Sequence, residues 1–503
     1  MKFHIIVYGC QMNYSDSARI KAVLTNCWFF YTSQIQDADI IIIDTCSVRQ
    51  KAEDKVFGKL KEIPKDKKIC ITGCMIQHNL KFKKLTKLEE TVNDQFNIWN
   101  FQWNLQTKDP FIVWLEGEDI QDIIYKLNKQ NKLIQAKQNT LLVNSAFNPL
   151  YKKIKNRFKN LELIFRIDDL GYIPIVLKNL WYKISTKKKN QIINEYTWIF
   201  PTWSNQSLNE NLKSAYIPIQ TGCSQFCAYC IVPYARWLEK NRKKEDIINE
   251  VEYQIQKWIK EMILVGQIVN KHPQFAEILK KILKFKEIKW LRYTSPYPNF
   301  YNDELFQLHQ DEPKLCPHIH IPAQSGSNKI LKKMFRWYSS QQFKEFIDKI
   351  KSLNRDISIT TDMIIWFPWE TENDFQKSLD LVKYGNFDMI FMWIYSPRPG
   401  TIWARKYSDD IAYKTKKQRW HKMNDLLKKI SYENNQREVW KTYNIIIDDV
   451  WESAIWHNKQ MKNIILHSKK DVKKLKIGDI ASIQIKKWDS FNLYGSLISS
   501  YKV

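Results

Sequence analysis

Glycine is scarce in this chain, and tryptophan is abundant. The sequence has 12 glycines among 503 residues, together with 20 tryptophans. Average usage of about 7% would give roughly 35 glycines. The sequence also lacks a run of about eighteen apolar residues, so it offers no candidate membrane-spanning helix. Residues Met1–His4 do not begin a signal peptide. We therefore expect a cytoplasmic protein of two to four domains without a membrane partner.

Disulfides are not expected, because the nine cysteines form an odd set in a chain without an export signal. Three of them form a group that we name the CxxxCxxC triad: Cys223, Cys227 and Cys230. Three thiolates can hold three corners of an iron–sulfur cube and leave the fourth iron open to an outside ligand. The alternatives are a zinc site or buried structural cysteines, although no second CxxC pair or neighbouring histidine supports zinc.

Positive charge dominates the chain, with a formal net charge of +26 spread along its length. Diffuse positive charge favours a polyanion partner through the release of counterions, so RNA or DNA is a candidate partner. A composition rich in Lys, Ile and Asn that reflects an AT-rich genome is the alternative explanation.

Residues 1–75 alternate apolar strands with helices. Strands are expected at Lys2–Tyr8, Asp39–Asp44 and Ile69–Thr72, and helices at about 15–26 and 47–62. This alternation predicts a parallel α/β sheet, in which ligands lie outside the carboxyl ends of the strands. One cysteine follows each strand, and we name this group the strand-end triad: Cys10, Cys46 and Cys74. These cysteines can therefore converge in space, the alternative being three unrelated buried thiols. The cysteines without this placement are interpreted as core or incidental thiols: Cys27, Cys70 and Cys316.

The middle of the chain changes character twice. Residues of about 80–160 form an irregular, Lys- and Asn-rich insertion, and residues 161–180 regain apolar periodicity and are expected to rejoin the first region. Strands then recur at Tyr216–Gln220, Glu261–Val265, His318–Ile321, Ile357–Ile365 and Met389–Tyr395. This pattern predicts an open or partial (β/α) barrel with its working loops on one face.

The last 65 or so residues contain short β-branched runs separated by turns and lysines. The expected strands are Tyr443–Ile447, Asn463–Leu466, Ile480–Ile485 and Leu493–Ile498. Such runs predict a small β-barrel of the OB-like type, which often binds nucleic acid. A purely structural cap is the alternative.

The CxxxCxxC spacing, with the aromatic Tyr229 before the last cysteine, resembles the radical S-adenosylmethionine (SAM) enzymes. The two cysteine triads together resemble those of the methylthiotransferases, a family within the radical SAM enzymes. This resemblance implies an N-terminal methylthiotransferase domain over 1–205, a radical SAM domain over 209–436 and an RNA-binding TRAM domain over 438–503. It also implies two 4Fe–4S clusters, one on the CxxxCxxC triad and an auxiliary one on the strand-end triad.

Flanking residues narrow the implied substrate. Gly9–Asn13 and Thr45–Arg49 resemble the branch that adds a methylthio group to C2 of N(6)-dimethylallyladenosine in tRNA. The resemblance implies two SAM molecules per turnover and a reductant such as flavodoxin or ferredoxin, and it leaves the sulfur donor open. The alternatives are a methylthiotransferase acting on threonylcarbamoyladenosine or a ribosomal protein, and a non-catalytic Fe–S protein that binds RNA.

Residues in loops after the expected strands are further candidates for SAM contacts: Gly266, Gln267, Gln324 and Ser325. Ordinary turn roles are the alternative for each. Two arginines could meet tRNA phosphate or the SAM carboxylate, or could form surface salt bridges: Arg236 and Arg398.

Several tryptophans stand where the resembled family has glycine: Trp237, Trp258, Trp337, Trp366, Trp369, Trp440 and Trp451. Glycine serves where φ is positive or where the backbone approaches a ligand, and indole is a poor replacement there. The combined count of 32 glycines and tryptophans is close to an ordinary glycine count alone. We hypothesise that many of these tryptophans are glycines encoded by a reassigned UGA codon, and we expect crowding around Trp237, Trp366 and Trp369. A protein that is genuinely rich in tryptophans for base stacking is the alternative.

Overall fold

The fold comes from a computed structural model. It describes residues 1–26, 29–46, 50–78, 112–114, 136–137, 140–142, 154–165, 167, 170, 214–236, 238–398, 400–406, 412–447, 455–466 and 468–502. The chain forms two compact units. The first comprises Met1–Leu208 with Tyr234–Arg236, and the second comprises Asn209–Pro233 with Trp237–Val503. The short Tyr234–Arg236 segment, which the sequence assigned to the radical SAM domain, therefore packs with the N-terminal unit. The domain boundaries near 205 and 437 remain predictions.

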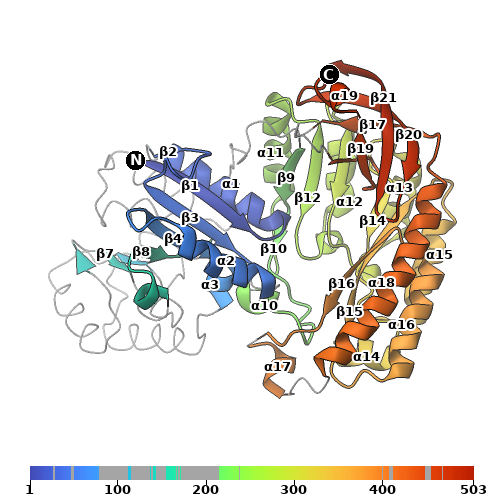
Figure 1. The fold of residues 1–503 in the computed structure, drawn as a ribbon, viewed down its shortest axis with the longest axis horizontal. Helices are drawn as coiled ribbons and strands as arrows, with labels where there is room; N and C mark the ends of the chain where they lie inside the picture. The colour runs from blue at the N-terminus through green and yellow to red at the C-terminus, as the bar shows by residue number, and fades with distance from the viewer. Residues whose placement is uncertain are drawn as a thin grey trace. The chain divides into compact units, whose positions relative to one another are not determined.

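The first unit is built on a parallel sheet with the strand order β2-β1-β3-β4-β8 (Figure 1). Its strands are β1 Lys2–Tyr8, β2 Phe30–Tyr31, β3 Ile40–Thr45, β4 Lys68–Gly73 and β8 Leu161–Ile164. Its helices include α1 Gln11–Asn26, α2 Gln50–Glu62 and α3 Cys74–His78. Every residue of β3 is buried, as expected for a parallel strand that is covered on both faces.

The predicted α/β sheet is confirmed, and β8 confirms that the chain rejoins the first region after the insertion. The sequence prediction missed the two-residue strand β2 and started the first helix too late. The insertion lies mostly outside the described residues. Its described part includes a small antiparallel sheet of β5 Ile112–Trp114, β6 Ala136–Lys137 and β7 Thr140–Leu142.

The second unit begins with two three-stranded parallel sheets in the orders β13-β12-β9 and β14-β15-β16. The strands of this region are β9 Ser214–Pro218, β10 Gln220–Thr221, β11 Lys240–Asn241, β12 Glu261–Val265, β13 Trp290–Tyr293, β14 His318–His320, β15 Ser358–Ile365 and β16 Met389–Ile394. A parallel bridge between Leu291 and Leu315 joins the two sheets edge to edge. The result is one curved parallel sheet, which confirms the predicted partial barrel.

Amphipathic helices cover this sheet. They are α11 Lys244–Gln256, α12 Phe275–Leu283, α13 Asp303–Asp311, α14 Asn328–Lys333, α15 Ser340–Lys351, α16 Glu372–Gly385, α17 Ile402–Lys406 and α18 Tyr413–Gln436, with the short 3₁₀ turns η4 Val269–Lys271 and η5 Pro298–Phe300. The four-residue helix α10 Val232–Ala235 precedes them and runs into the segment that packs with the first unit. In α12 the buried residues Phe275, Ile278, Leu279 and Ile282 follow the helical repeat and form one apolar face. No described helix has both the length and the hydropathy needed to cross a membrane.

The C-terminal residues form a five-stranded barrel in the order β17-β20-β21-β19-β18. Its elements are β17 Thr442–Ile446, β18 Ile455–His457, β19 Asn463–Leu466, α19 Lys469–Val472, β20 Asp479–Trp488 and β21 Asn492–Lys502. Strands β19 and β21 are parallel and the other pairs are antiparallel, while β17 lies against β18. This arrangement is that of a Greek-key barrel, which confirms the predicted OB-like type. The sequence prediction missed the three-residue strand β18.

Four tryptophans have left-handed backbone conformations: Trp258, Trp366, Trp369 and Trp440, with φ of +61°, +73°, +65° and +69°. Crowding around the tryptophan rings stays a prediction; the Trp366 indole is fully buried and donates a 2.8 Å hydrogen bond to the Lys416 carbonyl. Trp369 is 42% exposed. Trp237 and Trp451 lie outside the described residues.

Candidate active site

The CxxxCxxC triad lies on the loop after β10. The amide of Cys230 donates to the Cys227 carbonyl at 2.9 Å and turns the loop back on itself. Ala228 fixes the loop at its centre, since its amide donates to the Met334 carbonyl and its carbonyl accepts from the Trp403 amide. Backbone hydrogen bonds to α14 and α17 thus hold the three cysteines in place.

Burial and mutual repulsion govern these thiols. Burial raises the pKa of Cys223 to about 11. Burial also raises the pKa of Cys230, and the neighbouring Cys227 and Cys223 raise it further. The three sulfurs therefore lie close enough to feel one another's charge, and free thiolates are disfavoured. Cationic iron would remove this penalty, so the donor set fits a cluster.

A partly buried arginine, Arg336, reaches the same loop. The Nη1 of Arg336 lies 3.6 Å from Cys227 Sγ, and its Nη2 donates to the Pro322 carbonyl at 2.9 Å. Its Nε donates to the Tyr338 hydroxyl at 3.0 Å, and its guanidinium lies over the Tyr297 ring at 4.4 Å. The sequence analysis did not single out Arg336, and its only signal was an arginine set among aromatic residues.

Gly266 and Gln267 lie directly after β12, as predicted. A Cβ on Gly266 would approach Gln220 Cβ at 3.2 Å, so the loop packs tightly against the segment that leads into the cysteine loop. The next amide, that of Ile268, donates to Gln220 Oε1 at 3.0 Å. Gln267 Oε1 is buried and has no hydrogen-bond partner among the described residues. This orphaned acceptor suits a donor on a ligand such as the SAM ammonium group.

Gln324 and Ser325 lie on the loop after β14. Gln324 adopts φ of +67°, and its amide donates to the Asp362 carbonyl at 2.8 Å. Its Oε1 is a second buried acceptor without a partner in the described part of the chain. In contrast, Ser325 Oγ accepts from the Ser327 amide and lies 3.4 Å from Ser378 Oγ. The structure therefore favours ligand contact for Gln324 and a turn role for Ser325.

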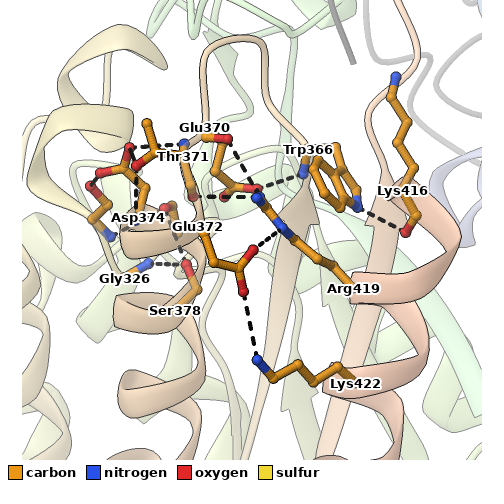
Figure 2. Close-up of polar contacts among 12 residues, drawn as sticks. Gly326, Trp366, Glu370, Thr371, Glu372, Asp374, Ser378, Lys416, Arg419 and Lys422 are labelled. Carbon is orange, nitrogen blue, oxygen red and sulfur yellow. Dashed lines mark hydrogen bonds and ion pairs between the residues drawn. The ribbon is translucent and has the colours of Figure 1, made fainter. Parts of the chain in front are cut away.

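Polar contacts fix the turn after β15 (Figure 2). The amide of Trp366 donates to Glu370 Oε2 at 3.0 Å, and Arg419 lies over the Trp366 ring at 3.8 Å. The neighbouring Phe367 packs edge-on against Tyr229 with ring centroids 6.3 Å apart. The turn thereby supports the cysteine loop through this aromatic pair.

The strand-end triad lies in the first unit at the carboxyl ends of three adjacent parallel strands. The register pairs Tyr8 with Thr45 and Thr45 with Gly73, so the three following cysteines occupy one edge of the sheet. Burial raises the pKa of the Cys74 thiol to about 12, and the nearby thiols of Cys46 and Cys10 raise it further. The predicted convergence is therefore present.

Polar residues surround this triad, and among them the sequence analysis proposed only Arg236 as a site residue. The Asn13 side chain accepts from the Cys10 amide at 3.1 Å and donates to Asp44 Oδ1 at 2.9 Å. Burial raises the pKa of Asp44 to about 7, and the charge of Asp16 also contributes. Arg236 Nε donates to Cys74 Sγ at 3.2 Å, and its Nη2 pairs with Asp16 at 2.6 Å.

The remaining candidates differ in outcome. Cys70 and Cys316 are buried, as expected of core thiols, and Cys27 lies outside the described residues. Surface salt bridges were a wrong interpretation for Arg236 and Arg398, which are only 8% and 7% exposed. No three His, Cys, Asp or Glu side chains of the described residues are arranged to hold a single metal ion. A cube takes one thiolate at each of three irons, and its ligands are accordingly spread more widely than those of one ion.

Two family descriptions match this chain. The "Radical SAM superfamily" matches residues 217–382, and "Uncharacterized protein family UPF0004" matches residues 2–95. These ranges contain the CxxxCxxC triad and the strand-end triad respectively.

Curated relatives align over most of the chain. A protein of Thermoanaerobacter sp. (strain X514) is 31% identical over 99% of this chain and 92% of its own length. One of Dictyoglomus thermophilum is 32% identical over 89% of this chain and 88% of its own. One of Carboxydothermus hydrogenoformans is 28% identical over 99% of both. Each bears the name tRNA-2-methylthio-N(6)-dimethylallyladenosine synthase.

Proposed function

The chain belongs to the methylthiotransferase family of radical SAM enzymes, and we propose that it adds a methylthio group to C2 of N(6)-dimethylallyladenosine in tRNA. The observation that carries this proposal is the presence of two separate cysteine triads, each at the ligand-binding end of a parallel sheet. The names of the relatives favour the prenylated adenosine over threonylcarbamoyladenosine or a ribosomal protein.

A 4Fe–4S cluster and SAM are the cofactors of radical SAM enzymes, and we assign the cluster to the CxxxCxxC triad. When bound, they supply the 5′-deoxyadenosyl radical that removes hydrogen from C2, a bond that no side-chain base can usefully deprotonate. The buried acceptors of Gln267 and Gln324 would take hydrogen bonds from SAM, and the tight loop at Gly266 would let the backbone approach it.

The strand-end triad would hold an auxiliary 4Fe–4S cluster, which would supply the sulfur for the transfer. A second SAM would methylate that sulfur, so each product consumes two SAM molecules. SAM cleavage needs an electron, for which a flavodoxin or ferredoxin would be the donor. The residues around Cys10, chiefly Asn13, hold its backbone in place for this role.

The C-terminal barrel would hold the tRNA. OB-like barrels commonly bind nucleic acid, and this one presents exposed lysines that suit phosphate: Lys473, Lys476 and Lys487. The chain's net charge of +26 points the same way. A tRNA-modifying enzyme of this kind would act in the cytoplasm.

The test is an anaerobic assay with both clusters reconstituted, SAM, a reductant and tRNA containing N(6)-dimethylallyladenosine. We expect 5′-deoxyadenosine from SAM cleavage and the methylthiolated nucleoside from the tRNA. Deoxyadenosine without that nucleoside would indicate another substrate, and no SAM cleavage would indicate a binding protein. Cys227→Ala should abolish SAM cleavage, whereas Cys46→Ala should keep cleavage and lose sulfur insertion.

A further inference from the structure

Each cysteine triad has one arginine that donates to one of its sulfurs, a buried arginine in the first unit and a partly buried one in the second. Arg336 reaches Cys227 in the second unit, and Arg236 reaches Cys74 in the first. The two arginines come from different parts of the chain and serve different sheets. The contact of Arg336 with Cys227 is not needed to hold the loop after β10, because backbone hydrogen bonds already fix that loop.

The two arginines differ in what surrounds their charge. Arg236 pairs with Asp16, whose side chain is 1% exposed. Arg336 is surrounded by a carbonyl and aromatic rings, and the described residues include no carboxylate that forms an ion pair with it. Arg336 is partly buried, and withdrawing a cation from water is costly unless it has a favourable partner. An anionic thiolate or cluster beside Cys227 would be that partner.

We propose that Arg336 and Arg236 are positioning residues, each of which donates a charged hydrogen bond to one cysteine sulfur and thereby raises the reduction potential of the cluster there. The proposal rests on the proposed function insofar as both triads hold clusters. Hydrogen bonds to the sulfurs and nearby charge are established determinants of cluster potential, and a cation stabilises the more negative, reduced cluster. Loss of either arginine should therefore lower the potential of its own cluster only.

The experiment uses full-length chains that retain a single cluster. One background carries Ala at the strand-end triad, and the other carries Ala at the CxxxCxxC triad. Arg336→Gln, Arg336→Lys, Arg236→Gln and Arg236→Lys are placed in both backgrounds. Redox titration followed by electron paramagnetic resonance then gives the midpoint potential, after iron content and circular dichroism confirm assembly and folding.

We expect Arg336→Gln to shift the reduction equilibrium of the CxxxCxxC cluster about tenfold, which is 59 mV for one electron. It should leave the strand-end cluster unchanged, and Arg236→Gln should do the reverse. The lysine variants keep the positive charge, so they should retain part of the increase in reduction potential that the arginine causes. Loss of iron at only the matching triad in a folded chain would also support the proposal. Unchanged potentials in all four variants, or equal shifts in both clusters, would overturn it.

This outcome is separable from the proposed function, because the potentials are measured without tRNA. If the potentials shift in a chain that makes no methylthiolated nucleoside, the role of the arginines is supported and the proposed substrate is rejected. If the chain makes the product but the potentials are unchanged in the variants, the proposed substrate is supported and the role of the arginines is rejected.

A second, independent observation concerns the left-handed tryptophans. Ten described residues other than glycine have positive φ, and four of them are tryptophan, although tryptophan supplies only 20 of 503 residues. Bulky side chains rarely adopt this conformation because Cβ meets the backbone. Such strain persists where packing compensates for it. Trp258 and Trp440 are 69% and 66% exposed, so they bury little surface that could compensate for the strain.

The end of helix α11 at Trp258 shows most clearly why this conformation favours glycine. The amide of Trp258 donates to the Ile255 carbonyl, and the amide of Ile259 donates to the Gln254 carbonyl. These two bonds form a Schellman motif that ends α11, and its left-handed position is usually glycine.

The geometry points to glycine at positions 258, 366, 369 and 440 of the protein made in its own cell, through UGA codons read as glycine. Peptide mass spectrometry of the natively produced protein should find glycine at these four positions. Trp290, which lies buried in the extended strand β13, should remain tryptophan. Tryptophan in the four peptides, or TGG codons in the gene, would overturn this inference.

A stability measurement provides a second test. Trp258→Gly should raise the thermal midpoint by about 2 °C because it relieves backbone strain. Trp337→Gly is the matched control, since Trp337 is 67% exposed but does not have positive φ. Equal effects of the two substitutions would contradict the role of backbone strain.

Discussion

At the scale of single residues, burial decides which groups carry charge. The thiols of Cys74 and Cys223, one from each triad, resist ionisation because burial raises their pKa values. The carboxyl of Glu370 behaves in the same way at the turn after β15, where burial raises its pKa to about 7 despite the nearby Arg419. Ordinary glutamate titrates near 4.3, so this group makes the stability of the turn depend on pH.

Glu370→Gln should change how stability depends on pH. A raised carboxyl pKa stabilises the fold fully below about pH 4.5, and this contribution is lost as pH rises through about 7. The wild-type chain should therefore lose up to about 3 kcal/mol relative to Glu370→Gln between these pH values. Denaturant unfolding of both chains at pH 5 and pH 8 gives the comparison. A difference that does not vary with pH would contradict the assignment.

At the scale of secondary-structure elements, the ends of strands and the first turns of helices hold the loops that carry the candidate SAM-contacting residues. Asp374, near the start of α16, accepts from Ser327 Oγ at 2.7 Å and from Thr371 Oγ1 at 2.7 Å (Figure 2). The amide of Gly326 donates to Ser378 Oγ at 2.9 Å. The loop that contains Gln324 is thus fastened to the first two turns of one helix.

Gly326→Ala should loosen this loop. A Cβ there would lie 2.3 Å from the Lys377 carbonyl oxygen, which is fixed helix backbone, so the loop must move away. We expect a loss of about 1–3 kcal/mol in the free energy of unfolding, together with weaker SAM binding. Urea unfolding and isothermal titration with SAM measure the two effects.

Gly58→Ala is the matched control for that substitution. Gly58 is exposed within α2, and a Cβ there meets nothing within 4 Å. This variant should gain about 0.5–1 kcal/mol from helix propensity. If Gly326→Ala behaved like Gly58→Ala, the tight packing of the loop on α16 would be refuted.

The sequence predicted elements well where apolar residues run long. The all-isoleucine run of β3 and the strand β12 have no helical alternative at that length. Strand β13 was missed because Trp290–Tyr293 is short and contains an arginine. That arginine, Arg292, is stabilised by Glu261 on the neighbouring strand and by two carbonyls of the C-terminal barrel, which only the folded chain brings together.

The residues of the candidate site also divide into those that the sequence could predict and those that it could not. The cysteines were found because spacing and strand ends are local features of the sequence. Arg336 lies 109 residues from Cys227, and Arg236 lies 162 residues from Cys74, so no local pattern could pair them. The SAM-loop candidates fell between these cases, since Gln324 has an unpaired acceptor and Ser325 is used within its own turn.

At the scale of the whole molecule, the chain joins two α/β sheets, each with its own cysteine triad, to a basic barrel. The net charge of +26 is large enough to attract tRNA without any specific contact. A specific role for the barrel requires that its own lysines contribute more than lysines elsewhere.

Replacement of barrel lysines should weaken tRNA binding and reduce its dependence on salt. The double variant Lys473→Glu, Lys487→Glu should lower the slope of log affinity against log salt by about 0.7–0.9 for each phosphate that the barrel no longer neutralises. Lys284→Glu, on an exposed lysine after α12, is the control and should change the slope little. Filter binding at several salt concentrations measures the slopes. Equal reductions in the two variants would argue against the barrel as the tRNA-binding module.

The iron content of the reconstituted chain tests the two-cluster account most directly. If each triad holds a 4Fe–4S cluster, the wild-type chain binds about eight iron atoms, and replacing either triad with alanine leaves about four. A wild-type value of about four that disappears when the CxxxCxxC triad alone is replaced would contradict it.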